Sequence, residues 1–233
     1  MPGYLTHQQT VTITGADDLI IRSLLDRQQF ADPLGHAQRI GISSATWPLF
    51  GLLWPSARQL AARMALHRLQ PGQRILEIGC GLALASLVGH RRGADVTASD
   101  NHPLTARFLA ANLRLNALPP MNYRHGAWAQ LLAAASDPPQ RPNAAVRGRY
   151  ELIIGSDVLY DRDASAALAG FIGRHGATAG EVWIVDPDRG NRPAFNRRMG
   201  ALGYGLEDCR IDSAARLGAL AYRGRLLVYR REA

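Results

Sequence analysis

Short apolar runs alternate with segments of helical periodicity through most of this chain, and this alternation constrains the fold more than any other feature of the sequence. The expected strands are residues 74–78, 95–99, 121–125, 150–156 and 181–185. Apolar side chains recur at helical spacing in residues 84–90, 104–116 and 164–175, and a further helix is expected after Pro193. Strand–helix alternation of this length predicts an α/β fold with a doubly wound, largely parallel sheet.

The two ends of the chain depart from this alternation. Two more strands, near residues 206–211 and 225–229, are joined by a short connector, which favours an antiparallel hairpin and brings the sheet to seven strands. Near the N-terminus, residues 10–14 alternate as a strand, and residues 17–30 fit a short helix or a second strand. We expect an N-terminal extension over residues 1–42 and one domain over residues 43–233, which contains a helix over 52–69.

The basic charge of the chain admits two interpretations. A formal net charge of +8 can concentrate acidic or nucleic-acid partners. However, the chain contains no lysine and its arginines are scattered along the sequence, so we favour compositional bias. No stretch is long and apolar enough to span a bilayer, and no export signal is seen, so we expect a cytoplasmic protein. Cys80 and Cys209 form no paired motif, and neither a metal site nor a disulfide is expected.

A glycine-rich turn, Glu77-Ile78-Gly79-Cys80-Gly81, follows the first strand of the expected sheet, where doubly wound folds bind nucleotides. A turn that binds pyrophosphate needs Gly or Ala three residues after Gly81, but Leu84 stands there. The turn therefore suits a cationic ligand without phosphate, whose amino-acid part can approach the backbone at Gly79 and Gly81. Glu77 either orients the turn or faces an ammonium group of the ligand.

Asp100 closes the next strand and stands 21 positions after Gly79 (100 − 79 = 21). A carboxylate at this place can accept hydrogen bonds from both hydroxyls of a ribose. The alternative role is to cap the helix that begins near Pro103, and the two roles are compatible.

Several segments together resemble the seven-strand protein methyltransferases of methyltransferase family 16, which include many protein-lysine methyltransferases. The resemblance extends from about Ser43 to the C-terminus. The segments that carry it are Leu53-Trp54-Pro55-Ser56, Leu76-Glu77-Ile78-Gly79-Cys80-Gly81, Val96-Thr97-Ala98-Ser99-Asp100, Gly126-Ala127-Trp128 and Ser156-Asp157-Val158-Leu159-Tyr160. The chain departs from the family pattern in two places, since Ala127 precedes Trp128 and Ala83 replaces a frequent glycine.

The resemblance implies a Rossmann-like seven-stranded fold and S-adenosyl-L-methionine as the methyl donor. It implies donor contacts from Trp54, Gly79, Gly81, Asp100, Trp128 and Ser156. Glu77, at the start of the glycine turn, is a further candidate for a donor contact. The resemblance also places Asp157 and Tyr160, as an Asp-x-x-Tyr motif, beside the transferable methyl group. Simpler roles remain open for three of these residues. Trp54 can be a core residue, in which case Trp47 is the candidate for the donor contact. Trp128 can anchor a loop, and Tyr160 can be a surface side chain.

The function expected from these residues is methyl transfer to a lysine side chain of a protein substrate. Asp157 with Tyr160 would orient the amine, and an acidic mouth made by Asp157, with help from Asp186 and Asp188, would attract the cationic side chain. A small-molecule N- or O-methyltransferase is the main alternative. A nucleic-acid methyltransferase is disfavoured because the fourth strand ends without the Pro-Pro turn that grips a flipped adenine, and a donor-binding protein without activity is the remaining possibility.

Overall fold

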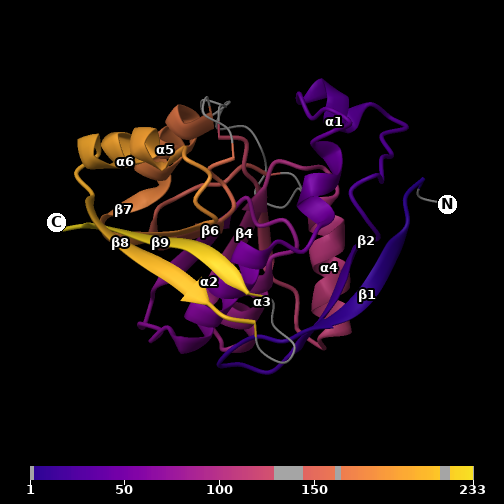
Figure 1. The fold of residues 1–233 in the computed structure, drawn as a ribbon, viewed down its shortest axis with the longest axis horizontal. Coiled ribbons are helices and arrows are strands. Elements are labelled where there is room, and N and C mark those ends of the chain that lie inside the picture. The colour runs from indigo at the N-terminus through magenta and orange to yellow at the C-terminus, as the bar shows by residue number, and fades with distance from the viewer. Residues whose placement is uncertain (1–2, 129–143, 161–163, 216–220, 233) are drawn as a thin grey trace.

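The computed structural model describes residues 3–128, 144–160, 164–215 and 221–232 (Figure 1). The strands are β1 (Thr6–Val11), β2 (Leu19–Leu24), β3 (Arg74–Ile78), β4 (Asp95–Asp100), β5 (Asn122–His125), β6 (Tyr150–Ser156), β7 (Gly176–Asp186), β8 (Gly205–Ser213) and β9 (Tyr222–Arg231). The helices are α1 (His36–Arg39), α2 (Pro55–Leu66), α3 (Leu84–Arg91), α4 (Thr105–Leu115), α5 (Ala164–His175) and α6 (Arg192–Ala201), with a 3₁₀ turn at Trp47–Gly51.

A seven-stranded sheet with the order β5-β4-β3-β6-β7-β9-β8 forms the centre of the molecule. The strands from β5 to β7 in this order pair in parallel, whereas β9 pairs antiparallel with both β7 and β8. The mostly parallel seven-stranded sheet with a C-terminal antiparallel hairpin is therefore confirmed. From β3 the chain adds β4 and β5 on one side, and it then returns to add β6 on the other side of β3. In such sheets ligands bind at this switch point in strand order, beyond the carboxyl ends of the strands.

Helices cover both faces of the sheet, because successive side chains of the central strands enter two different cores. Ile75 and Leu152 belong to a core that includes side chains of α2, α3 and α4, whereas Leu76 and Ile153 belong to one that includes α5 and α6. Figure 1 shows α5 and α6 above the sheet and α2 and α3 below it. Burial on both faces explains why these strands are continuously apolar.

The N-terminal residues form an antiparallel β1–β2 hairpin, so the second-strand alternative for residues 17–30 holds, and the first strand begins earlier than residue 10. Helix α4 fastens this hairpin: Asn116 Oδ1 accepts from the Ile20 backbone N–H at 2.9 Å, and Asn112 Oδ1 accepts from that of Arg22 at 2.8 Å. Buried hairpin residues share one core with Phe108 of α4. The domain boundary at residue 42 stays a prediction, but the hairpin packs as part of one molecule.

Most predicted element bounds lie within a few residues of those observed, and β7 is the exception. It begins at Gly176, directly after α5, instead of at residue 181. The first pair, Tyr150 with Gly176, is separated from the regular ladder by a register shift. The added residues 176–180 lack an apolar pattern, which is why the sequence did not indicate them. Helix α2 is shorter than predicted, since it ends at Leu66.

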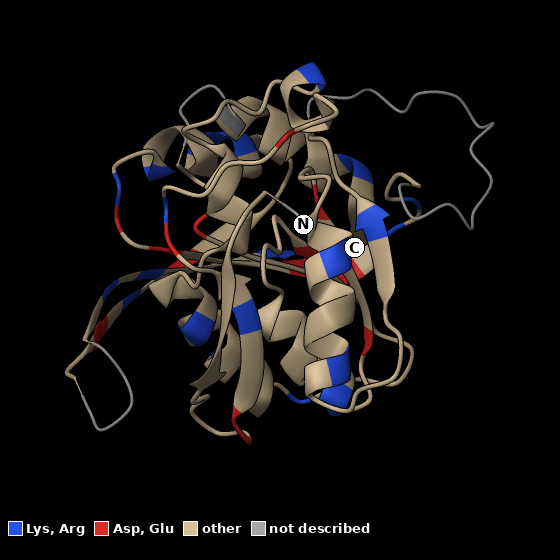
Figure 2. Ribbon diagram, turned by 90° about the vertical axis from the view of Figure 1, so that its right-hand side faces the viewer, with Lys and Arg blue, Asp and Glu red and all other residues tan. Residues whose placement is uncertain are grey.

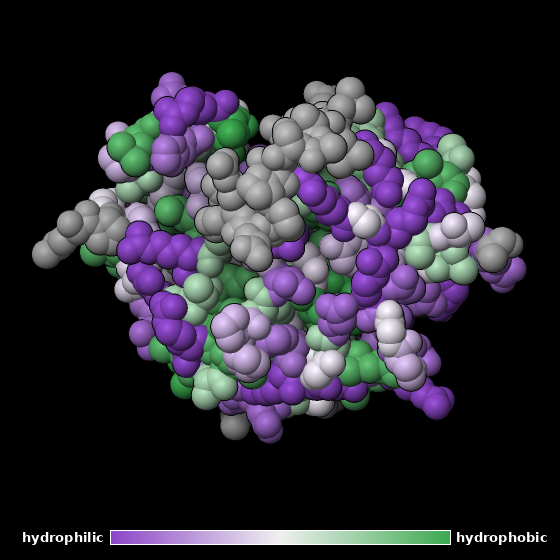
Figure 3. Space-filling model, turned by 180° about the vertical axis from the view of Figure 1, so that it is seen from behind, coloured by the Kyte–Doolittle hydropathy of each residue, from purple (hydrophilic) through white to green (hydrophobic). Residues whose placement is uncertain are grey.

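Arginines occur on helices, strands and loops throughout the part of the fold drawn in Figure 2, and they do not gather in one patch. On the face seen in Figure 3, hydrophilic side chains are interspersed with hydrophobic ones. Within the described ranges, no helix has the length and apolar character needed to cross a membrane.

Candidate functional site

The carboxyl ends of β3, β4 and β6 open into a cavity of about 820 Å³. Eight of the nine residues singled out in the sequence line this cavity: Trp54, Gly79, Gly81, Asp100, Trp128, Ser156, Asp157 and Tyr160. Only Glu77 lies outside its lining. Side chains that precede residue 43, including Arg27, Ile40 and Ile42, also line it, so the N-terminal segment covers one side of the cavity.

The glycine turn needs both of its glycines. Gly79 and Gly81 have positive φ angles of 57° and 50°, a region that other residues seldom adopt. A Cβ atom on Gly79 would lie 2.9 Å from Val158 Cγ1, and one on Gly81 would lie 2.9 Å from the carbonyl oxygen of Phe50. The same hypothetical Cβ on Gly79 would lie 3.4 Å from Trp128 Cζ2, which places the Trp128 ring against the turn. The missing side chains therefore let the surrounding residues and a ligand approach the backbone.

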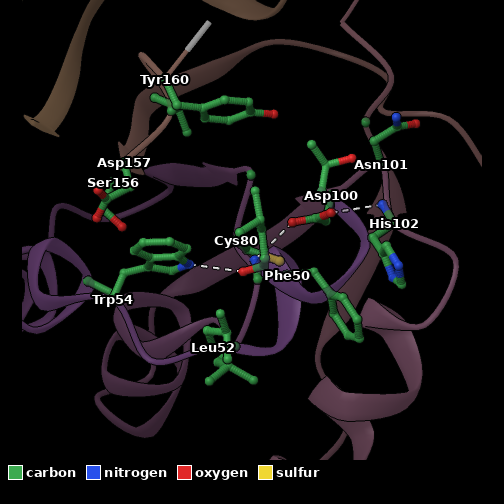
Figure 4. Close-up of a pocket in the computed structure, with 18 of the residues that line it drawn as sticks. Phe50, Leu52, Trp54, Cys80, Asp100, Asn101, His102, Ser156, Asp157 and Tyr160 are labelled. Atoms are coloured by element: carbon green, nitrogen blue, oxygen red, sulfur yellow. Dashed lines mark hydrogen bonds between the residues drawn. The ribbon is translucent and has the colours of Figure 1, made fainter. Parts of the chain in front are cut away.

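Asp100 connects the glycine turn with the loop after β4. Its Oδ2 accepts from the Gly81 backbone N–H at 2.9 Å, and its Oδ1 accepts from that of His102 at 2.8 Å (Figure 4). The N-cap residue of α4 is Leu104, so Asp100 does not cap this helix. Burial raises the pKa of Asp100, and the two backbone donors oppose this rise. Each oxygen keeps a lone pair for a further donor, as the two hydroxyls of a ribose would provide.

Glu77 lies behind the turn and is 2% exposed. Its Oε2 accepts hydrogen bonds from the Ser86 backbone N–H at 2.8 Å and from the Ser86 hydroxyl. Burial raises the pKa of this carboxyl group to about 7. The geometry supports the first of the two roles proposed for Glu77, that of orienting the turn, because Ser86 at the start of α3 donates both hydrogen bonds to its buried carboxyl group. Contact between Glu77 and a ligand stays a prediction.

Trp47 and Trp54 were both candidates for a contact with the ligand, and their positions in the structure differ. Trp54 lines the cavity, and its Nε1 donates to the Leu49 carbonyl at 2.9 Å. The guanidinium groups of Arg27 and Arg189 lie 5.1 Å and 5.7 Å from the centre of its ring. Trp47 is 1% exposed and belongs to the core. Of Trp47 and Trp54, it is thus Trp54 that can contact a ligand in the cavity.

At the opposite side from Asp100, the β6 strand ends at Ser156 and presents Asp157 (Figure 4). Asp157 has a positive φ of 57°, and its backbone N–H donates to the Val185 carbonyl at 3.0 Å. Its Oδ1 lies 2.6 Å from Nη2 of Arg189. Burial raises the pKa of Asp157, while the donors of Ser56 and the charge of Arg189 oppose the rise. Tyr160 is 55% exposed and also lines the cavity.

The acidic mouth expected from the sequence is not formed. Asp186 is 1% exposed, accepts from the Asp188 backbone N–H at 2.8 Å, and does not line the cavity. Asp188 pairs with Arg192 instead. The described residues that bring charge to this end of the cavity, besides Asp157, are the arginines Arg27 and Arg189. The loop after β7 does reach the site, as its position in the sequence suggested, but it does so through Arg189.

Two aromatic residues of the lining were not anticipated. The rings of Phe50 and His102 stack with their centres 3.7 Å apart and an angle of 8° between their planes. His102 Nδ1 lies 3.2 Å from the Leu104 backbone nitrogen, which donates to it. Burial lowers the pKa of His102 to about 3, so this side chain is neutral at physiological pH. No sequence motif indicates this pair, because Phe50 and His102 lie far apart in the sequence and meet only in the folded protein.

The family described as lysine methyltransferase matches residues 51–192 of the chain. The electron transfer flavoprotein beta subunit lysine methyltransferase of Xenopus laevis is 26% identical over 170 residues, which cover 69% of this chain and 62% of that protein. The histone-arginine methyltransferase METTL23 of Rattus norvegicus is 31% identical over 113 residues, which cover 47% of this chain and 46% of that protein. The chain therefore spans less than two thirds of the length of each of these relatives.

Among solved structures, a magnesium protoporphyrin IX methyltransferase from Synechocystis PCC 6803 with bound S-adenosylmethionine superposes with a TM-score of 0.55. The sequences are 19% identical, and the match covers 76% of this chain and 78% of that one. This likeness shows that the fold is the Rossmann-like methyltransferase fold.

Proposed function

The chain belongs to the lysine methyltransferase family, and on this premise we propose that it transfers a methyl group from S-adenosylmethionine to a lysine side chain of a protein substrate. The observation that carries the proposal is the cavity itself. It joins the Gly79–Gly81 turn and Asp100 at one end to Asp157 at the other. A donor held at the first end would direct its methyl group toward the second.

The residues present fit this donor. A volume of about 820 Å³ lies within the range of roughly 300–1,000 Å³ that is usual for small-molecule sites. Asp100 offers acceptor oxygens to a ribose, Trp54 and Trp128 offer aromatic faces to a cation or a purine, and the two glycines admit an amino-acid group to the backbone. Leu84 stands where a turn that binds pyrophosphate needs Gly or Ala, which agrees with a nucleoside donor that lacks pyrophosphate.

When bound, S-adenosylmethionine supplies a methyl group on a sulfonium, which an amine lone pair can displace in line. The protein's part is to align the acceptor and to exclude water. A lysine amine is protonated at neutral pH, and to make it neutral at pH 7 costs about 4.6 kcal/mol given a pKa near 10.4. In this proposal Asp157 accepts a hydrogen bond from the amine; both Asp157 and Tyr160 line the cavity.

The named relatives support a protein as the substrate, since one acts on a lysine of a flavoprotein subunit and the other on histone arginine. We expect a folded protein of the cytoplasm with a lysine acceptor. The test is to incubate the purified protein with radiolabelled S-adenosylmethionine and cell lysate, and to treat the products with protease or nuclease. Label that is lost with protease and is recovered as methyllysine after acid hydrolysis supports the proposal. Label in nucleic acid, in a small molecule or as methylarginine contradicts it.

Substitution of Asp157 tests whether the two ends of the cavity have separate roles in acceptor and donor binding. We predict that Asp157→Asn lowers the rate of methyl transfer by about 10²-fold or more, because the amide offers a weaker acceptor and loses the charge paired with Arg189. Donor affinity, measured by calorimetry, should change by less than about threefold, since the hydrogen bonds given for Asp157 join it to Arg189 and Val185 and not to the glycine turn. An equal loss of transfer rate and donor affinity would mean that Asp157 acts in donor binding instead.

A further inference from the structure

We propose that Arg189 is a positioning residue of the methyl transfer, which fixes the Asp157 carboxylate and makes the site select an uncharged acceptor amine. The inference rests on the proposed function and deepens it. A site that receives a lysine is expected to be acidic, yet this cavity presents an arginine at the carboxylate that would receive the amine.

The contact between Arg189 and Asp157 is built by the sheet. β6 and β7 are parallel neighbours, and Ser156 pairs with Val185, so the loops that follow both strands leave the sheet side by side. A second contact fastens these loops, since Asn191 Nδ2 donates to the Leu159 carbonyl at 2.8 Å. The pair is also sheltered: Asp157 is 8% exposed and Arg189 is 35% exposed. It is therefore more than a surface ion pair.

Arg189 is held from two sides. Its Nη2 lies 2.6 Å from Asp157 Oδ1, and its guanidinium carbon lies 5.7 Å from the centre of the Trp54 ring. The other oxygen of Asp157, Oδ2, is buried, and Ser56 at the start of α2 is a further neighbour of this carboxyl group; burial raises the pKa of Asp157, and the donors of Ser56 oppose this rise. Because Asp157 lines the cavity, an amine that enters it can donate to this carboxylate while the guanidinium stays in place.

The charge of Arg189 changes which form of the amine this carboxylate prefers. A lone carboxylate raises the pKa of a nearby amine and so holds it as ammonium, which has no lone pair for attack. A cation at the same distance lowers that pKa, by roughly 1 to 3 for an unscreened charge within about 4–6 Å. With both present, the carboxylate still accepts a hydrogen bond but no longer favours the charged form. The amine releases its proton to water before it binds; its lone pair then forms the N–C bond as the C–S bond breaks and the electron pair returns to sulfur.

The neighbouring titratable groups leave the opposite effects of Asp157 and Arg189 on the pKa of the amine in place. Tyr222 on β9 faces the pair, and burial raises its pKa to about 12, so it is neutral. Asp186 at the end of β7 lies 3.8 Å from Arg192 of α6, which offsets its charge. Tyr160 borders the same cavity, and Arg27 lies against Trp54 and adds a further positive charge.

The test uses n-butylamine, which reproduces the end of a lysine side chain, with S-adenosylhomocysteine already bound to the full-length protein. Calorimetric titrations from about pH 7 to about pH 10, below the amine pKa near 10.4, measure the apparent affinity. For the wild-type protein we expect affinity to rise about tenfold for each pH unit, in step with the neutral fraction of the amine. For Arg189→Gln we expect nearly constant affinity over this range, because Asp157 then holds the ammonium form.

Two variants complete the experiment. Arg189→Lys keeps the positive charge and should follow the wild-type pH dependence. Arg225→Gln, which removes an equal charge that pairs with Asp188 and Asp208 outside the cavity, should do so too. The proposal is overturned if Arg189→Gln and the wild type share one pH dependence, if Arg189→Lys behaves as Arg189→Gln, or if the wild type takes no butylamine at any pH. Failure of the proposed function would appear separately, as wild-type protein that does not bind S-adenosylhomocysteine.

Discussion

Glu77 shows how one buried side chain can set the pH response of the fold. Its pKa of about 7 in the folded protein lies above the ordinary value of 4.5, and burial is the main cause. The folded state therefore binds the proton more tightly than the unfolded state. The stability that this provides is fully present below about pH 4.5, and it is lost as the pH rises through about 7. The loss is about 3 kcal/mol, at about 1.4 kcal/mol for each unit of pKa difference.

Glu77→Gln tests this directly. The amide stays neutral, and its oxygen can still accept from Ser86. We predict that the free energy of unfolding of the variant, relative to the wild type, increases between about pH 4.5 and about pH 7 by up to about 3 kcal/mol. Urea denaturation at a series of pH values measures it. The difference between the two proteins removes the opposing effect of His102, whose pKa is lowered to about 3 and whose stabilising effect is lost on acidification. A difference that is constant with pH would contradict the raised pKa.

Asp100 provides a second prediction at the scale of one residue. Asp100→Ala should weaken donor binding by about 1.5–3 kcal/mol, the range for hydrogen bonds to a charged group, which is roughly a tenfold to 150-fold higher Kd. The substitution also removes the acceptors of the Gly81 and His102 backbone N–H groups. Asp95→Ala, at the exposed start of the same strand, is the matched control and should bind as the wild type does. Unchanged affinity of Asp100→Ala in calorimetry would mean that this carboxylate only organises the loop.

At the scale of elements, the turn between β3 and α3 depends on close approach as well as on backbone conformation. Gly81→Ala must accept a positive φ and a Cβ atom 2.9 Å from the Phe50 carbonyl oxygen. Gly93→Ala, just after α3, must accept a positive φ with nothing within 4 Å. We predict a loss of about 1 kcal/mol of stability for Gly93→Ala and at least about 1 kcal/mol more for Gly81→Ala.

Chemical denaturation compares these two variants, and calorimetry with S-adenosylmethionine adds a functional measure. Gly81→Ala should also weaken donor binding, because the shifted turn carries Asp100 with it, whereas Gly93→Ala should not. Equal losses of stability would show that the chain can move Phe50 away at little cost.

At the scale of the whole molecule, the absence of lysine means that self-methylation reports which type of acceptor the enzyme accepts. All 27 basic residues counted as Lys or Arg are arginines. With S-adenosylmethionine and no substrate, an enzyme that modifies lysine has only the Met1 amine as an acceptor of the same kind. We predict that mass spectrometry finds no methylation beyond the N-terminus after prolonged incubation. Methylated arginines would move the acceptor class to that of the arginine methyltransferases.

The cavity is also a property of the whole molecule, since its walls come from segments far apart in the chain. Residues from the N-terminal segment, the glycine turn and the loops after β4, β6 and β7 all line it. The β1–β2 hairpin positions the first of these walls by its bonds to α4. The local sequence of residues 1–42 gives no indication of this role, because each contact is made with a residue distant in sequence.

The sequence by itself determined the parallel strands, the glycine turn and the placement of Asp100 and Asp157 at strand ends. These are local signals: apolar periodicity selects strand or helix, and the carboxyl ends of parallel strands meet at one edge of the sheet. Only the tertiary structure decided that Trp54 and not Trp47 borders the cavity, that Glu77 faces α3, and that Arg189 pairs with Asp157. These outcomes depend on which side chains meet after packing, and charge along the sequence does not fix which opposite charges come together in space.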